Sequence, residues 1–326
     1  MNPWYQKALM AAGAGVLGAG WITLDPASAW PGGLVLASAG FPLAVLLAVA
    51  GRLNASPSPT ALIGGGTIGV AIAILSHAVV FAFAYLFFLG FADAGTSALG
   101  ALRIDPEFTS VLRSPWTILL LVELVLVAPL TEEAGKAFGA LVGRPSTRQE
   151  AFLAGVAAGV GFAMVENIAY GAGGYFGFDA WEPIVLGRVL GAAVHPLASG
   201  LVVLAWWELR NGTGRRGAIG RLLAGVAVHA GWNASLAVVA IAGIAYDYGG
   251  APGTFAAASL AYTAAIGVLT AAALWFMVSV VNEDIPAADL APTNGRALAG
   301  WTVLTSSLLV PVALLVLAFP DFLNAG

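Results

Sequence analysis

The stretch that decides the fold is residues 116–142, WTILLLVELVLVAPLTEEAGKAFGALV, which is long and apolar enough to cross a bilayer. It nevertheless carries Glu132, Glu133 and Lys136, and a later apolar stretch carries Glu166. Each charged side chain at the centre of a membrane helix costs about 2.5–3.5 kcal/mol, so four unpaired ones would cost roughly 10–14 kcal/mol. Only pairing, a metal ion or a water-filled site offsets such a penalty. The sequence therefore predicts a polar centre inside the membrane, and we expect the function to lie there.

Composition places the chain among membrane proteins. Of its 326 residues 60% are hydrophobic and 9% are charged, whereas soluble domains carry about 25% charged residues. The net charge is −4 and the basic residues are scattered, so no nucleic-acid partner is expected. Cysteine is absent, which excludes disulfides and thiolate chemistry. A metal site would have to use carboxylates, amides or the three histidines, His77, His195 and His229.

Apolar runs predict an all-α, polytopic transmembrane helix bundle of about nine spans. We expect one integral membrane domain over residues 1–326, multi-pass in the cell membrane. The first run, which resembles a signal peptide, is interpreted as an uncleaved helix. The predicted spans are 8–24, 32–50, 61–90, 116–142, 150–173, 184–208, 218–244, 253–281 and 297–318.

Basic residues in the connections predict the orientation. Only Arg103 and Arg113 lie in connections that would face outward, which favours a bundle with its N-terminus inside and its C-terminus outside. Gly155 and Gly159 have the small-residue spacing that permits close helix packing. The basic residues on the predicted inner side are Lys7, Arg52, Arg144, Arg148, Arg210, Arg215, Arg216, Arg221 and Arg296.

Helical geometry brings acids and imidazoles to a similar depth. At about 1.5 Å per residue, Glu133, Glu166, His195 and His229 lie roughly 14–24 Å from the inner ends of four predicted helices. Lys136 is three and four residues from the two adjacent glutamates and can neutralise either one. A purely structural ion pair is the alternative, but two carboxylates for one lysine leave a surplus charge. We therefore favour a functional site.

Neighbouring residues extend this interpretation. His229 and Asn233 share a helix face, and Pro196 after His195 predicts a kink in span 184–208. His77 has no acidic neighbour in its own span and is interpreted as packing. Two further expectations lie outside the site. Glu123, nine residues before Glu132, should face the opposite side of its helix unless Pro129 rotates that relation, and Arg188 near an outer end can reach the membrane surface.

Taken together, four motifs across residues 116–240 resemble the PrsW family of intramembrane proteases. That family is similar to the CAAX-protease and bacteriocin-processing superfamily, in which a histidine stands at the position of Glu166. The motifs are Glu132-Glu133-x-x-Lys136, Phe162-x-x-x-Glu166-Asn167, His195-x-x-x-Ser199 and His229-x-x-x-Asn233.

The resemblance implies a metallopeptidase that cleaves membrane proteins or peptides, as when PrsW-type enzymes clip an anti-sigma factor. The implied cofactor is a divalent ion, most plausibly zinc. One of Glu132 and Glu133 would be the base for a bound water, and the other a ligand or the partner of Lys136. Asn233 would steady the oxyanion. The implied metal ligands are Glu133, Glu166, His195 and His229, with Lys136, Phe162 and Asn167 as structural support.

Other mechanisms and functions stay open at this point. A metal-free hydrolase would use Glu132 as base, assisted by Glu166, with His229 and Asn233 binding the oxyanion. An ion- or proton-coupled transporter also uses buried carboxylates, although no inverted repeat is evident. A scaffold whose polar core only specifies helix packing is the third alternative.

Overall fold

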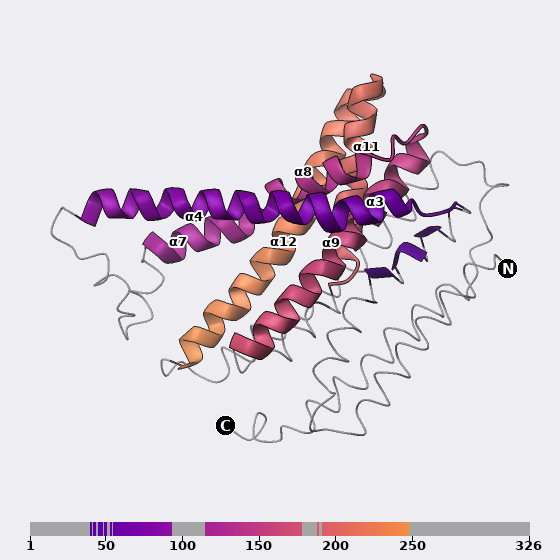
Figure 1. The fold of residues 1–326 in the computed structure, drawn as a ribbon. Helices are drawn as coiled ribbons and strands as arrows, with labels where there is room; N and C mark the ends of the chain where they lie inside the picture. Colours follow the sequence, from indigo (N-terminus) through magenta and orange to yellow (C-terminus); the bar gives the residue numbers. More distant parts are fainter. Residues whose placement is uncertain are drawn as a thin grey trace, which may run out of the picture. The chain divides into compact units, whose positions relative to one another are not determined.

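A computed structural model of the chain describes residues 55–92, 115–177 and 191–247, together with Arg188 and scattered positions between 40 and 53 (Figure 1). The chain divides into two compact units. One, here called the core unit, comprises Ser58–Phe162 and Val194–Ala272, and the second comprises Met1–Pro57, Ala163–Ala193 and Ala273–Gly326. The prediction of a single integral membrane domain stays a prediction.

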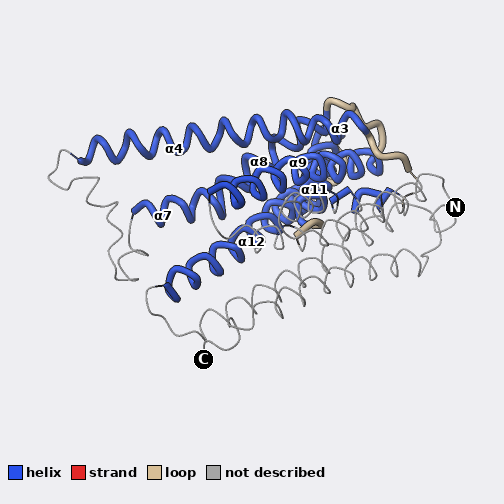
Figure 2. Tube along the Cα trace, turned by 60° about the horizontal axis from the view of Figure 1, so that its bottom comes forward, coloured by secondary structure: helices blue, strands red, loops and turns tan. Residues whose placement is uncertain are grey.

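All regular structure in the described residues is helical, which confirms the predicted all-α class for this part of the chain (Figure 2). Two of the described helices are long and apolar enough to cross a membrane, Pro59–Phe83 and Arg148–Tyr170, with mean hydropathy 2.1 and 1.6. The nine spans and the orientation remain predictions. Spans 8–24, 253–281 and 297–318 lie outside the described residues, as does most of span 32–50.

The first helical rod of the core unit consists of α3 (Pro59–Gly64), the π-helical turn η1 (Gly65–Gly69) and α4 (Val70–Ala92) (Figure 1). It begins at Ser58, whose hydroxyl accepts a hydrogen bond of 3.2 Å from the Ala61 N–H. Pro59 follows in the first turn, where its missing N–H would have no helical partner anyway.

The second rod consists of α7 (Pro115–Val122), the π-helical turn η2 (Glu123–Val127) and α8 (Ala128–Leu141). Pro129 explains the wide turn, because its ring would collide with the Val125 carbonyl in a regular α-helix. The Ala128 N–H accordingly donates to the Glu123 carbonyl five residues earlier. One extra residue is thereby accommodated in the turn just before the Glu132-Glu133 pair.

Three further helices complete the described part: α9 (Arg148–Gly177), α11 (Val194–Asn211) and α12 (Arg215–Asp247). Helices α11 and α12 pack along each other and are joined by a short turn. In this turn Gly212 and Gly214 have φ of 70° and 63°, a conformation that glycine adopts without a Cβ clash.

The start of α11 differs from the prediction. A turn at residues 191–193 interrupts the helix predicted over 184–208, and α11 begins after it at Val194. Pro196 therefore lies in the first turn of α11, where proline is tolerated, and the irregularity in the predicted span is a turn before Pro196 instead of a kink at it. His195 is placed at a helix start instead of within a span.

Helix α8 lies at the centre of the core unit and packs against α3, η1, α4, α11 and α12. Glycines permit these close approaches: a Cβ on Gly139 would overlap the backbone of Gly64. Between α9 and α11, a Cβ on Gly159 would overlap the backbone of His195 and Pro196, and one on Gly155 that of Ser199. The close packing predicted for Gly155 and Gly159 is thus confirmed, and it brings His195 against α9.

Candidate active site

The centre of the site is the buried face of α8. Glu132 and Glu133 are 5% and 1% exposed, and Lys136 is fully buried. The Lys136 ammonium donates to Glu133 Oε1 at 2.7 Å and to Glu132 Oε2 at 3.4 Å. The lysine therefore lies closer to the carboxylate of Glu133 than to that of Glu132.

Glu133 is held by donors from three helices. Besides Lys136, the Ser199 hydroxyl on α11 donates to its Oε2 at 2.7 Å. Nδ1 of His229 on α12 lies 2.9 Å from its Oε1. Charge-assisted hydrogen bonds of this kind fix a carboxylate firmly in a medium of low dielectric constant. Glu133 is thus suited to orient other groups of the site.

Glu132, His195 and His229 converge on one point. One ligand atom from each lies within 4.8 Å of the others, and all three residues are buried. His229 Nε2 is 3.6 Å from Glu132 Oε2, and the two imidazole rings meet edge to face with centroids 4.5 Å apart. Three different helices, α8, α11 and α12, supply these groups.

The convergent set fits a divalent cation. Two imidazoles and a carboxylate are the ligands of a catalytic zinc site, which keeps its fourth position open. The bond from Glu133 to His229 Nδ1 leaves Nε2 as the metal-binding nitrogen, the usual carboxylate–histidine–metal arrangement. His195 Nδ1 lies 3.0 Å from the Lys136 ammonium. Metal at the other nitrogen of His195 would place the ring proton on Nδ1, so this lysine contact would have to rearrange.

Phe162 supports the charged cluster from α9. The Lys136 ammonium lies 4.0 Å from the centre of its ring, at a cation–π distance. The ring also packs against His195, with centroids 5.6 Å apart. The structure therefore brings Phe162, Lys136 and His195 together, and the supporting role of Phe162 stays a prediction.

Asn233 contacts the π-helical turn. Its Nδ2 donates to the Leu124 carbonyl at 2.8 Å. In the π register that carbonyl would accept from residue 129, but Pro129 has no N–H. Asn233 thus satisfies an acceptor that the backbone leaves without a donor. Its predicted role at the oxyanion stays a prediction.

His77 and Glu123 were assigned no role by the sequence, and both expectations about them are wrong. His77 Nδ1 forms an ion pair and hydrogen bond with Glu123, and its Nε2 lies 3.6 Å from Glu132 Oε1. Because η2 takes up one extra residue, Glu123 and Glu132 are about 80° apart around the helix instead of about 180°. In the sequence, Pro129 was the residue that indicated an irregular helix between Glu123 and Glu132.

Glu166 and Asn167 fall on the part of α9 that belongs to the second unit. Glu166 accepts a hydrogen bond of 2.8 Å from Arg188, whose guanidinium lies 4.1 Å from the centre of the Tyr170 ring. Arg188 is only 9% exposed, so the expectation that it reaches the membrane surface is wrong. Asn167 is buried as well. Metal binding by Glu166 stays a prediction.

A buried centre of carboxylates and imidazoles that can hold a metal, built on helices in an apolar chain, defines the class of membrane-embedded metallohydrolases. The family model of the PrsW family intramembrane metalloproteases matches residues 60–255, which is more of the chain than the four motifs span. The protein belongs to this family, as its motifs predicted. Comparisons with curated proteins and with solved structures found no match.

Family membership has direct consequences. The protein is located in a membrane and belongs to a family of peptidases, and the implied cofactor is a divalent metal. The transporter alternative receives no support from the family or from the described residues. The identity of the metal, the role of each site residue and the substrate belong to the proposal that follows.

Proposed function

We propose that this protein hydrolyses peptide bonds of membrane-embedded or membrane-associated proteins at the centre formed by Glu132, His195 and His229. The convergence of these three side chains within 4.8 Å in the interior of the core unit is the observation that carries the proposal. Zinc is the metal that their nitrogen and oxygen donors suit best. When bound, zinc would polarise the scissile carbonyl and lower the pKa of a water molecule.

The contacts suggest different roles for the two adjacent glutamates. Both oxygens of Glu133 accept hydrogen bonds from Lys136, Ser199 or His229, so we assign to Glu133 the orientation of His229. Glu132 converges with His195 and His229 and is assigned to the reacting side, where it would hold the metal. From the sequence motifs, Glu166 and Asn233 are proposed as further participants, Asn233 through its remaining amide hydrogen toward the oxyanion.

A metal-free mechanism is the second candidate, favoured by one observation. The contact between Lys136 and His195 Nδ1 is satisfied without any ion, since an ammonium can donate to a neutral imidazole. In that mechanism Glu132 takes the proton from the attacking water. The two mechanisms share the same residues and differ in metal content.

Elemental analysis of purified wild-type protein tests the proposal, with His195→Ala and His229→Ala as loss variants. Glu150→Gln serves as a control, because the Glu150 side chain is exposed and accepts its hydrogen bonds from Ser146 at the start of α9, away from the site. We expect nearly one zinc per chain in wild type and control and none in the histidine variants. A folded wild type without metal would overturn the metal-dependent mechanism.

Peptidase activity is tested by labelling new protein N-termini in membranes of cells that express wild type or Glu132→Gln. We expect wild-type-specific termini in or beside hydrophobic segments of membrane proteins. Such proteins, including anti-sigma-factor-like ones, are the proposed substrates. Identical sets of termini in the two membranes would overturn the assignment of Glu132 to catalysis. The proposed location is the cell membrane, with a multi-pass topology of about nine spans.

A further inference from the structure

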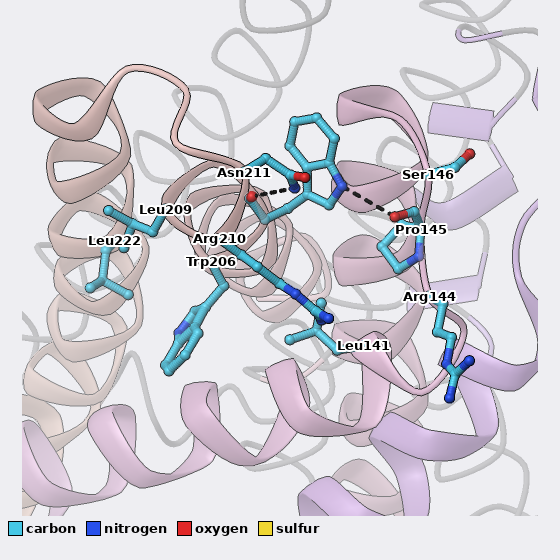
Figure 3. A pocket seen from close by; sticks show the side chains of 10 residues that line it. Leu141, Arg144, Pro145, Ser146, Trp206, Leu209, Arg210, Asn211 and Leu222 are labelled. Atoms are coloured by element: carbon cyan, nitrogen blue, oxygen red, sulfur yellow. Dashed lines mark hydrogen bonds between the residues drawn. The ribbon is translucent and has the colours of Figure 1, made fainter.

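A cavity of about 1080 Å³ opens at the ends of α8, α11 and α12, away from the Glu132 centre along the chain (Figure 3). Its lining combines two arginines, Arg144 and Arg210, with the apolar side chains of Trp206, Leu209 and Leu222. The function proposed above uses none of these residues. A ligand that fits this mixture of cationic and apolar groups would carry both a negative charge and an apolar part.

The two arginines of the cavity differ from those beside them. Arg148 and Arg221 both donate to the buried carboxylate of Glu208, at 2.7 and 2.9 Å. Arg144 and Arg210 are exposed, and within the described residues neither guanidinium has an ion-pair partner. Figure 3 shows both side chains among the residues that line the cavity. The cavity thus offers two unneutralised positive charges to an anion.

The backbone of Arg144 is an independent observation. Its φ of 48° is in the left-handed region, which disfavours residues with a Cβ. Arg144 ends the second rod there, with its N–H donating to the Leu141 carbonyl at 3.0 Å. Glycine is the usual residue at such a position. The presence of arginine at a position that favours glycine is explained if the arginine side chain takes part in binding at the cavity.

Apolar side chains form the wall of the cavity, and a hydrogen bond links the helix that carries them to the connection after α8. Trp206 and Leu209 are 44% and 38% exposed, and Leu222 on α12 lies beside them. Trp207 Nε1 donates to the Pro145 carbonyl at 3.1 Å, which ties α11 to the connection after α8 (Figure 3). Ser146 is occupied with Glu150 and does not serve as an anion donor. Arginine and tryptophan together at helix ends are typical of the membrane–water interface.

We propose that this cavity binds an anionic phospholipid, with the phosphate between Arg144 and Arg210 and the first part of the acyl chains over Trp206, Leu209 and Leu222. A free phosphate ion would leave the apolar wall without a partner, and a zwitterionic lipid such as phosphatidylcholine would bring its own cation beside the two arginines. The proposal is independent of the peptidase function, since it uses only the helix ends.

Native mass spectrometry of the full chain in detergent, titrated with dioleoyl phosphatidylglycerol or dioleoyl phosphatidylcholine, tests it. The variants are Arg144→Gly and Arg210→Gln. Arg216→Gln is the matched control, because it removes one exposed charge at the same helix ends outside the cavity lining. We expect the wild type to retain phosphatidylglycerol in preference to phosphatidylcholine. The affinity for phosphatidylglycerol should fall about fivefold in each cavity variant, because each basic residue near an anionic lipid contributes to the binding free energy. The control should retain wild-type binding.

Arg144→Gly keeps the test free of folding effects, because glycine relieves the left-handed backbone and should leave the melting temperature unchanged or higher. Equal retention of the two lipids would overturn the proposal. So would wild-type binding in both cavity variants, or a loss of the same size in Arg216→Gln. Displacement of the lipid by millimolar inorganic phosphate would assign the arginines to free phosphate and overturn it as well.

Discussion

His229 Nδ1 lies 2.9 Å from Glu133 Oε1 in the interior of the core unit. This bond determines which nitrogen of the ring is left for a ligand, and it links the motif on α12 to the motif on α8. A carboxylate behind a metal-binding histidine typically increases metal affinity through ring orientation and basicity.

Glu133→Gln should therefore lower zinc affinity by about 10- to 100-fold. The amide keeps the shape of the side chain but loses the charge that orients His229. Competition with a zinc-sensitive dye measures the affinity, and Glu150→Gln serves as the surface control. Unchanged affinity in Glu133→Gln would remove Glu133 from the metal centre.

Metal removal should lower the thermal stability of the wild type. A ligand that binds only the folded protein at a thousand times its Kd stabilises it by about 4 kcal/mol. Melting curves with and without a chelator measure this difference. His195→Ala, which lacks one proposed ligand, should melt at the same temperature in both buffers, and a chelator effect of wild-type size in this variant would contradict the site.

Asn233→Ala should destabilise the protein by about 1 kcal/mol, because the half-buried Leu124 carbonyl loses its donor. Adding Pro129→Ala should recover part of this loss, since residue 129 regains an N–H for the helix. Thermal unfolding of the single and double variants measures the coupling. If stability recovers while peptide cleavage does not, Asn233 also acts in the reaction; additive losses would contradict the proposed tether.

His77→Ala should destabilise the protein by about 3–5 kcal/mol, because Glu123 is 5% exposed and loses its ion-pair partner. The double variant His77→Leu with Glu123→Leu removes both partners and should recover most of the stability. A double-mutant cycle by thermal unfolding measures the coupling energy, and a value near zero would contradict a structural ion pair.

Gly159→Ala should lower both stability and zinc binding, because its Cβ would overlap the backbone of His195 and displace that ligand. Gly220→Ala is the control: nothing lies within 4 Å of its Cβ position, and it should stabilise α12 by about 0.5–1 kcal/mol. Zinc content and melting temperature of the two variants, measured side by side, test the contrast. Equal behaviour would contradict the close approach of α9 and α11.

The sequence predicted the charge cluster well because burial makes unpaired charges expensive. Glu132, Glu133 and Lys136 are three and four residues apart on one helix, so their proximity follows from helical geometry alone. The contribution of His229 from a distant helix followed from the family resemblance. The structure adds that its Nδ1 bonds to Glu133.

The predictions about Glu123, Pro196 and Arg188 failed because they assumed regular, uninterrupted helices and considered only nearby residues. The π-helical turn before Pro129 places Glu123 beside His77. A prediction that assumes about 100° of rotation for every residue cannot include such a turn. The turn at residues 191–193 moved Pro196 from mid-helix to a helix start. Arg188 was assigned to the membrane surface because its partner, Glu166, lies 22 residues away and no local pattern connects them.

Exposure is uneven across the charged cluster, and this has a consequence for access. The His77 side chain is 31% exposed, whereas those of Glu132 and His229 are 7% and 1% exposed. Of these three side chains, His77 on α4 is thus the one accessible from outside the cluster, and Glu133 is shielded behind its three donors. A substitution at His77 therefore changes the cluster on its accessible side and leaves the contacts of Glu133 in place.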